Sequence, residues 1–422
     1  MDTAHNVIDA GSTAWMLASS ALVLLMVPGL ALFYGGLVQP KNVLSTMMHS
    51  FLAMAVIGVH WVLIGYCLSF GADVGGVVGF SPGLVGLAGL DHTALYADKR
   101  VPELVFVMFQ GKFAIITPAL ISGALAERLN LRGYLVFIVA WSTFIYCPLA
   151  HWVWASDGWL FKLGVLDFAG GTVVHIAAGV SALVLAIKVG PRRDFADALA
   201  RGEVPELRPN SLPLTLLGAG LLWFGWFGFN AGSAVAVESP VAGATASLAF
   251  ATTQAAAAAA GLAWLVIERL HAGRATSLGL ASGMLAGLVV ITPAAGHVSP
   301  ASALVMGSIA AGVCYAAVQL KHRFKVDDTL DAFAVHGVGG LLGAVLVGVF
   351  CFTPTPGLLH GEGDQLGKQL VGVVVTVAFA GLGTLIIGTI VDRFVGLRVS
   401  AEEEAEGLDL HTHGERGYRI AI

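Results

Sequence analysis

Two histidines lie inside apolar runs that are long enough to cross a lipid bilayer. His175 stands near the start of the run 171–189, and His336 near the start of the run 332–353. An ionisable side chain is costly in hydrocarbon, and it usually faces a pathway or a partner side chain rather than lipid. Two such residues in similar settings predict one site that is built from both halves of the chain.

The composition of the 422-residue chain supports a membrane location. Hydrophobic residues make up 57% of it and charged residues only 12%, whereas soluble domains carry about 25% charged residues. The 54 glycines suit closely packed transmembrane helices. The four cysteines are scattered without a CxxC pair, so we expect no disulfide framework and no metal site. No basic block indicates nucleic acid, and residues 1–13 lack the basic start of a cleavable signal peptide.

Runs of roughly 20 mainly apolar residues can each cross a bilayer, and eleven of them predict an all-α polytopic membrane protein. They cover residues 13–38, 46–71, 102–125, 133–154, 171–189, 212–233, 243–267, 276–293, 300–320, 332–353 and 369–391. An odd number of spans places the termini on opposite sides. Of the 22 Lys and Arg residues, 17 fall on the side of the C-terminal tail and four on the other. This asymmetry predicts an N-terminus outside and a C-terminus inside, and we expect a bacterial inner (plasma) membrane.

Short segments recur five spans apart. Residues 116–119 (Ile-Thr-Pro-Ala) recur at 291–294, and residues 33–36 (Phe-Tyr-Gly-Gly) resemble 229–232 (Phe-Asn-Ala-Gly). An Asp followed by a His begins both the fifth and the tenth span: Asp167 with His175, and Asp331 with His336. Because five is odd, the second copy is inverted relative to the first. Such a 5+5 inverted repeat places a substrate site near the midplane, where the repeats meet, and 369–391 is an extra helix.

The two histidines can share one chemical task. A neutral imidazole has one donor and one acceptor, so His175 and His336 can hydrogen-bond to each other, line a narrow lumen and relay a proton. The alternative is a packing histidine that bonds to a backbone carbonyl. We favour that alternative for His49, His60 and His151, which have no counterpart in the other half. A third ligand does not accompany the pair, so a metal is not favoured.

Acidic and aromatic side chains stand near the same spans. Asp167 comes just before the fifth span, where a carboxylate caps a helix well and also attracts cations. Phe109 and Phe113 share one helix face, and 223–233 is rich in aromatic residues. Aromatic faces bind desolvated cations, although from the residues alone a lipid-facing or core stripe is the commoner interpretation.

Several motifs together resemble the ammonium transporter (Amt/Rh) family, in its bacterial Amt-type form. They are Asp-Phe-Ala-Gly-Gly-Thr-Val-Val-His at 167–175, Gly-Trp-Phe-Gly-Phe-Asn-Ala-Gly-Ser at 225–233, Gly-Ala-Leu-Ala-Glu-Arg at 123–128, the segment 326–337, and the tail from 395 to 415. The first two motifs are highly specific, and the resemblance covers essentially the whole chain.

The resemblance implies a homotrimer of eleven-helix subunits with one pore each, formed by residues 1–400, and a cytoplasmic regulatory tail at 401–422. It also implies site residues, each at a matching motif position: twin pore histidines His175 and His336, a pore-lining Trp226, a gate of Phe113 and Phe229, and an ammonium-recruitment site of Phe109, Trp154 and Ser233 with the acidic Asp167 near it. These roles are expectations that follow from the resemblance.

The expected function is ammonium and ammonia transport, with methylammonium as a further substrate and no cofactor. Ammonium would be recruited at the outer aromatic site, deprotonated, and passed along the histidines. By resemblance the tail transmits binding of a trimeric PII signalling protein. Lys112 lies about 100° around the helix from Phe113. The sequence does not decide whether this cation affects conduction. Two alternatives remain: an ammonium sensor on the same scaffold, and a polytopic membrane metalloenzyme that uses the histidines.

Overall fold

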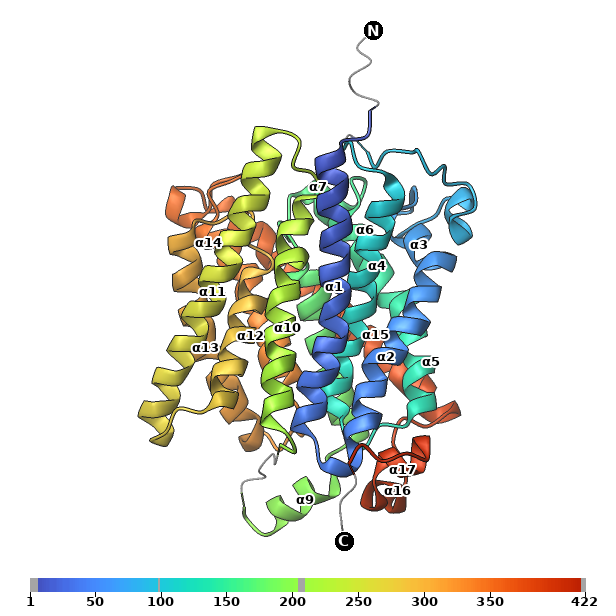
Figure 1. Ribbon diagram of the computed structural model, residues 1–422, viewed down its shortest axis with the longest axis vertical. Coiled ribbons are helices and arrows are strands. Elements are labelled where there is room, and N and C mark those ends of the chain that lie inside the picture. Colours follow the sequence, from blue (N-terminus) through green and yellow to red (C-terminus); the bar gives the residue numbers. More distant parts are fainter. Residues whose placement is uncertain (1–6, 98, 204–208, 419–422) are drawn as a thin grey trace.

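The computed structural model describes residues 7–97, 99–203 and 209–418. Long helices run between two faces of the molecule, and the described chain begins at one face and ends at the other (Figure 1). The tail helices α16 and α17 and the connecting helix α9 lie at the second face, which we call the tail face. The opposite one is the outer-loop face.

The first half of the chain forms helices that are broken by single π-helical turns. The π turn η3 joins α2 to α3, η6 joins α5 to α6, and η7 leads into α8. The bounds are α1 (Ala10–Leu37), α2 (Val43–His60), η3 (Trp61–Gly65), α3 (Tyr66–Phe70), α4 (Glu103–Ile121), α5 (Leu131–Trp141), η6 (Ser142–Tyr146), α6 (Cys147–Trp154), α7 (Trp159–Leu163), η7 (Gly171–Ile176), α8 (Ala177–Val189) and α9 (Arg193–Ala200).

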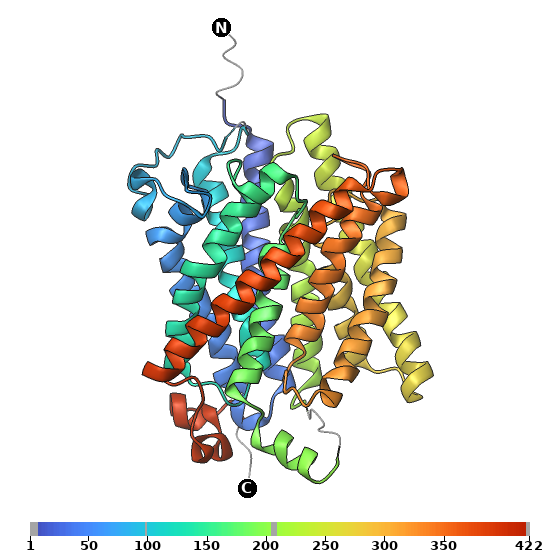
Figure 2. The same cartoon turned by 180° about the vertical axis from the view of Figure 1, so that it is seen from behind.

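The second half repeats the π-helical start, because η9 leads into α14 as η7 leads into α8. The last long helix, α15, crosses the back of the molecule obliquely (Figure 2). The bounds are α10 (Leu212–Ala231), α11 (Pro240–Ala272), α12 (Ser277–Ile291), α13 (Pro300–Arg323), η9 (Phe333–Gly337), α14 (Val338–Phe350), α15 (Asp364–Phe394), α16 (Ala401–Glu406) and α17 (Leu408–His413).

Short elements complete the chain. Strands β1 (Asp73–Val74) and β2 (Val78–Gly79) form an antiparallel hairpin at the outer-loop face, with Asp73 opposite Gly79. The 3₁₀ turns are η2 (Pro40–Asn42), η4 (Pro82–Leu87), η5 (Ser122–Leu125), η8 (Gly232–Ala234) and η10 (Leu358–His360).

Ten helices of the described chain are long and apolar enough to cross a membrane. They match ten of the eleven predicted spans. The remaining prediction, 276–293, corresponds to the shorter apolar helix α12, which has 15 residues. It ends at Ile291, two residues before Pro293, whose ring nitrogen has no hydrogen to donate. The structure is therefore that of a helical membrane protein.

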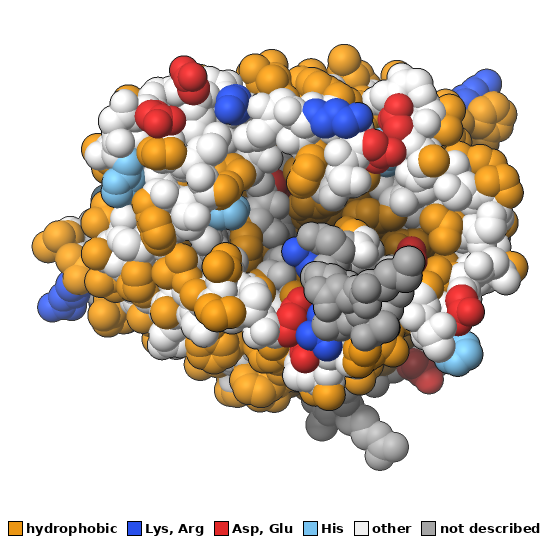
Figure 3. All heavy atoms as spheres, turned by 90° about the horizontal axis from the view of Figure 1, so that it is seen from above, with side chains coloured by type: hydrophobic (Ala, Val, Ile, Leu, Met, Phe, Trp, Pro, Cys, Tyr) orange, Lys and Arg blue, Asp and Glu red, His pale blue; other side chains and the backbone are white. Residues whose placement is uncertain are grey.

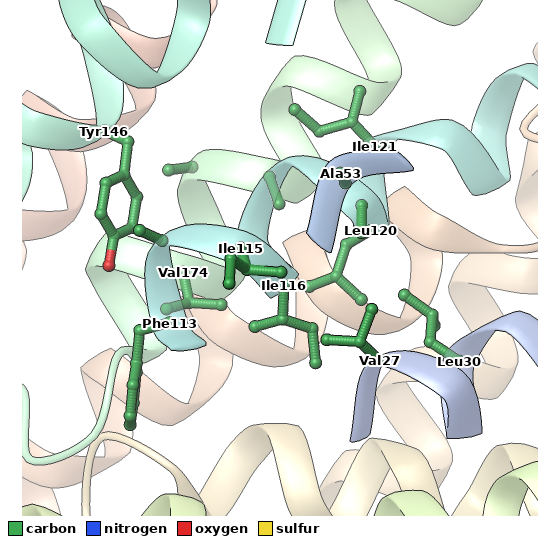
Figure 4. Packing of buried hydrophobic residues seen from close by; sticks show 14 of the residues in the cluster. Val27, Leu30, Ala53, Phe113, Ile115, Ile116, Leu120, Ile121, Tyr146 and Val174 are labelled. Carbon is green, nitrogen blue, oxygen red and sulfur yellow. The ribbon is translucent and has the colours of Figure 1, made fainter. Parts of the chain in front are cut away.

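Close helix crossings hold the two halves together. Helices α1 and α10, the first spans of the predicted repeats, meet at Gly218, where an added Cβ would lie 2.3 Å from the backbone nitrogen of Phe33. Such contacts suit a bundle that gains little from the hydrophobic effect in lipid. Apolar side chains of α4 and α1, such as Ile116 and Leu30, fill the interior beside them (Figure 4).

A buried cluster of charges closes the bundle at the tail face. Arg192 donates from Nε to Asp327 at 2.9 Å and from Nη1 to Glu127 at 2.6 Å. Arg128 lies 3.6 Å from the same Asp327 carboxylate and donates from Nη1 to Thr329. The cluster joins the segments that follow α4, α8 and α13, so it ties both halves of the chain at one point.

The ions in this cluster stabilise one another. Burial lowers the pKa of Arg128 to about 10. Burial would also lower the pKa of Arg192, but the Asp327 and Glu127 carboxylates outweigh it and raise that pKa. For Asp327, burial is likewise outweighed by Arg128 and Arg192, so its pKa is lowered. Arg128, Arg192 and Asp327 therefore stay charged at neutral pH, and each depends on its partners.

The tail is docked on the bundle. Glu404 accepts from the backbone N–H of Arg193 at 2.7 Å and from Nη2 of Arg398 at 2.8 Å. Asp409 accepts from the backbone N–H groups of Leu44 and Ser45, at 3.0 and 2.8 Å, and so caps the start of α2. Residues 419–422 of the predicted tail lie outside the described residues.

We expect Arg192→Met to destabilise the protein strongly, because it leaves the buried Glu127 carboxylate without its cation and removes one of the two arginines that face Asp327. Removing one partner of a buried pair costs about 3–5 kcal/mol. Arg201→Met removes the exposed Arg201–Glu203 pair and should have little effect. Thermal unfolding in detergent would compare the variants with the wild type. Equal midpoints for the two variants would contradict the prediction.

Candidate functional site

Two carboxylates begin the helices that carry the histidines. The Asp167 carboxylate accepts the backbone N–H groups of Gly170, Thr172 and Val173 at 2.9 to 3.0 Å. Asp328 does the same in the other half, where it accepts from residues 332–334 at 2.9 to 3.2 Å. Both carboxylates are buried. Each satisfies the free amides of a helix start inside the protein, where water does not reach them.

Each histidine follows its carboxylate by eight residues, His175 after Asp167 and His336 after Asp328. The Asp-then-His pattern at the start of the tenth span predicts Asp331, five residues before His336, as the counterpart of Asp167, and this prediction is wrong. Asp331 instead forms an ion pair with Lys321 at the tail face. The equal eight-residue spacing in the sequence would have identified Asp328.

Glycines let the two histidine segments touch. Gly179 is four residues after His175, and a Cβ there would lie 2.2 Å from the backbone nitrogen of Gly337. Gly340 is four residues after His336, and its Cβ would lie 2.9 Å from the Cβ of His175. Each glycine thus packs against the backbone beside the opposite histidine. This reciprocal contact brings the two rings together.

The two imidazoles face each other directly. Their Nδ1 atoms are 3.2 Å apart, and their rings are nearly parallel with centroids 5.2 Å apart. Since a hydrogen bond needs one donor and one acceptor, one Nδ1 carries a proton and the other does not. When both rings are neutral, one Nε2 is then an acceptor and the other a donor. Nε2 of His175 is buried and has no hydrogen-bond partner among the described residues.

Aromatic rings surround this pair. Trp226 of α10 stacks on His175 with centroids 5.4 Å apart, and its Nε1 donates to Thr292 at 2.9 Å. Thr292 lies just where α12 ends, so the early end of that helix positions the indole. The repeated Thr-Pro motif marked this position in the sequence, but nothing in the sequence predicted that Thr292 bonds to the Trp226 indole.

Two phenylalanines lie next to the histidines and toward the outer-loop face. The rings of Phe113 and Phe229 stack with centroids 4.1 Å apart and planes 21° apart. The ring of Phe229 is 6.1 Å from His175. Figure 4 shows Phe113 projecting from α4, apart from the aliphatic side chains Ile116 and Leu120 on the same helix. The expected gate residues are therefore in contact with each other.

The residues expected to recruit ammonium also gather around Phe113. The ring of Phe109 is 5.0 Å from that of Phe113, and the indole of Trp154 is 5.9 Å from it. Ser233 is half-buried beyond Phe229, and its Oγ donates to the Phe229 carbonyl at 2.9 Å. The face seen from above in Figure 3, which lies over this group, is hollowed near its middle and carries scattered charges.

Asp167 contacts the aromatic recruitment residues through its main chain and not through its carboxylate. Its carboxylate is occupied by the backbone amides of η7, whereas its main-chain carbonyl accepts from Nε1 of Trp154 at 2.9 Å. Its direct role is that of a helix cap, as the residue type suggested. It acts on the aromatic group by orienting Trp154 and by starting the helix of His175.

An apolar cavity continues from the histidines toward the tail face. Its walls include Trp226, Leu30, Tyr34 and Ser282, and Asp331 lies at its tail-face end. Lys112 is half-buried on α4 and is not among the residues that line this cavity. The cation that the sequence placed beside the gate therefore does not face the cavity on the tail side.

The other buried histidines have different partners. His60 meets Thr143 at 2.9 Å, and His151 meets both a carbonyl and a carboxylate. His49 packs edge-on against Tyr134. None of these three contacts the histidine pair in the described structure. In the part of the chain that the structure describes, no group of three or more His, Cys, Asp or Glu could hold a metal ion.

Comparison with known proteins identifies the family to which this site belongs. The sequence model of the Ammonium Transporter Family matches residues 14–418. An ammonium transporter of Mycobacterium tuberculosis is 47% identical over 98% of this chain and 91% of its own length. The crystal structure of Candida albicans Mep2 superposes with a TM-score of 0.86 at 35% identity, over 94% of this chain and 88% of that one.

A structure described as a sensor Amt protein is similar to the same degree, with a TM-score of 0.85 and 31% identity over 95% of this chain and 98% of that one. The family model extends over nearly the whole membrane bundle and includes both histidine segments. The chain belongs to the ammonium transporter family.

Proposed function

We propose that this protein carries ammonium and ammonia across the membrane through a pore in each subunit, by deprotonating ammonium at an outer aromatic site. The observation that supports this most is the order of side chains along one path. The aromatic group of Phe109 and Trp154 is followed by the stacked phenylalanines, the paired histidines and then the apolar cavity.

The outer group has the chemistry to hold a cation without an opposing charge. The faces of Phe109 and Trp154 attract a desolvated cation through their quadrupoles. The hydroxyl of Ser233 can accept a hydrogen bond from it, since its own proton is donated to Phe229. Ammonium offers donors in four directions and so satisfies both kinds of contact. Methylammonium has the same charge and fits as a substitute.

The path beyond the gate favours a neutral molecule. An apolar lumen penalises a desolvated ion heavily, and the size of ammonium resembles that of potassium, so acidity rather than size separates them. A proton lost near the gate can pass to the histidine pair, which offers one free acceptor and one donor when neutral. Ammonia has both kinds of group and can bond to each in turn.

We expect His175→Ala and His336→Ala each to change conduction while the protein stays folded. Flux should fall by about 10²-fold, the lower end of what a positioned proton-transferring group contributes. Discrimination against potassium should also change. Methylammonium and potassium fluxes into proteoliposomes measure both effects. Wild-type flux and selectivity in both variants would refute a role for the pair.

We expect Phe229→Ala to alter the gate more than Phe227→Ala does. Phe229 stacks on Phe113, whereas Phe227 stacks on Phe250 with centroids 4.1 Å apart, away from the path. The two changes remove the same side chain from the same helix, so Phe227→Ala is a matched control. Flux and potassium leak would be compared in proteoliposomes. Equal effects of the two changes would contradict the proposal that only the α10 face carrying Phe229 forms the gate.

The same proposal includes the assembly and its orientation. We propose a homotrimer in the inner (plasma) membrane, with the N-terminus outside, the tail inside, and α12 counted as an eleventh span. The excess of Lys and Arg on the tail side supports this orientation. Exposed apolar side chains on α10 and α11, such as Phe224 and Val241, are suited to lipid or to a neighbouring subunit.

We further propose that the tail receives a PII signalling protein. Its contacts through Glu404 and Asp409 reach the segments that follow α8 and begin α2. A protein bound to the tail could therefore act on the bundle through these contacts. The alternative is a tail that only stabilises the fold.

We expect deletion of residues 401–422 to leave an inserted trimer, to weaken transport, and to abolish PII capture. Removing Glu404 and Asp409 frees the N–H groups that they cap, which loosens the tail face without breaking the bundle. Pull-down on immobilised full-length and truncated protein, with the nucleotide varied, measures capture. Equal capture by both forms would mean that PII binds outside residues 401–422 or is not a partner.

A second candidate function is ammonium sensing without transport, which the similarity to the sensor Amt protein favours. Both functions need the outer cation site, but only transport needs a conducting path. Uptake of radiolabelled methylammonium into proteoliposomes separates them. Binding without uptake would favour the sensor.

A further inference from the structure

One histidine outside the pore has an unusual set of partners. His151 lies in α6 and is fully buried. Its Nδ1 is 3.1 Å from the carbonyl oxygen of Ser69, and its Nε2 is 3.0 Å from Oδ1 of Asp73. A backbone carbonyl can only accept a hydrogen bond, so Nδ1 carries a proton.

The second nitrogen must also carry a proton if the Asp73 carboxyl is ionised. The hydrogen bond from His151 and the backbone N–H of Gly76 lower the pKa of Asp73. Its side chain is about one-third exposed, so water also stabilises its charge. An ionised carboxylate only accepts, and Nε2 is therefore a donor. Both ring nitrogens then bear protons, and the ring is an imidazolium.

This pair is one of several links between α6 and the β1–β2 hairpin. Nε1 of Trp152 donates to the carbonyl of Val77 at 2.7 Å. The backbone N–H of Asp73 donates to Asp157, which follows α6, at 2.9 Å. The positive charge of Lys162 also lowers the pKa of Asp73. The hairpin is thus fastened to the end of α6 on both sides of His151.

The end of α6 carries the aromatic group at which we place ammonium. Trp154 is three residues after His151, and its indole is the one that donates to the Asp167 carbonyl. The backbone N–H of Ala155 donates to the His151 carbonyl at 3.2 Å, which closes the last turn of the helix. A shift of His151 would therefore move Trp154 relative to Phe113.

We propose that His151 is held as an imidazolium by Asp73 and Ser69, and that this charged clamp is a positioning element for Trp154 in the outer cation site. The assignment of the charge rests on the two hydrogen-bond partners of His151 and on the ionised state of the partly exposed Asp73 carboxyl. The consequence for uptake rests on the proposed function. The proposal makes His151 more than the packing histidine that its sequence position suggested.

The charge can be measured directly on the full-length protein in lipid vesicles at neutral pH. Solid-state NMR with ¹⁵N-labelled histidine distinguishes protonated from unprotonated ring nitrogens, and His151→Gln identifies the signal by its loss. We expect two protonated nitrogens in the wild type. Asp73→Asn should convert one of them to the unprotonated form, because a buried cation without an opposite charge is costly. One unprotonated nitrogen in the wild type would overturn the proposal.

The positioning role is tested with Asp73→Asn, because His151→Gln can also disturb folding. We expect the KM for methylammonium to rise about tenfold at unchanged maximal rate, less than the about 100-fold that a full misplacement can cost. Asp91→Asn is the matched control, since it removes an exposed carboxylate from the same face. An equal KM in the two variants would overturn the positioning role.

Hydrogen exchange gives a readout that does not require transport. Backbone amides of residues 151–158 should exchange faster in Asp73→Asn than in Asp91→Asn or the wild type. Exchange that is the same in all three would overturn the clamp. A wild-type protein that takes up no methylammonium would instead contradict the proposed function, while the NMR signal and the exchange rates still decide this inference.

Discussion

The site depends on two buried carboxylates that each start a helix inside the protein. A helix start leaves backbone N–H groups without partners, and in a bundle surrounded by lipid such groups are costly to leave unpaired. Asp167 and Asp328 accept three of these groups each. The helices can therefore begin at interior positions, and each presents its histidine eight residues later. Without these caps, each histidine helix would begin with unpaired N–H groups inside the protein, which would destabilise a helix start at that position.

Glycines bring the two histidine segments close together, and aromatic side chains fill the space around their rings. Gly179 and Gly340 remove side-chain volume, so the two histidine backbones approach each other. Trp226, Phe113 and Phe229 fill the space around the rings with flat apolar surface. The result is a polar pair in an apolar path. Under the proposed function, a neutral hydrogen-bonding molecule passes along these rings more readily than an ion does.

Clusters of charged and ionisable side chains also lie at the two faces of the bundle. On the tail face Arg192 is held between Asp327 and Glu127. On the outer-loop face His151 is held between Asp73 and a carbonyl. In both places a carboxylate accepts hydrogen bonds from a basic side chain, and the contact joins segments that are distant in the sequence. Electrostatic contacts thus fasten the ends of helices whose middles are held by packing.

The sequence by itself determined the class of the fold, and it proposed the side chains that the structure brings together around the histidine pair. Apolar runs identify membrane helices because lipid excludes unpaired backbone groups, and the motifs around His175 and Phe229 are specific enough to indicate the family. It did not determine that α12 stops at Thr292, that Asp328 rather than Asp331 is the counterpart of Asp167, or that His151 has two acceptors. These depend on contacts between segments far apart in the chain. Only the tertiary structure decides which donor meets which acceptor, because spacing along one helix carries no information about the partner across the bundle.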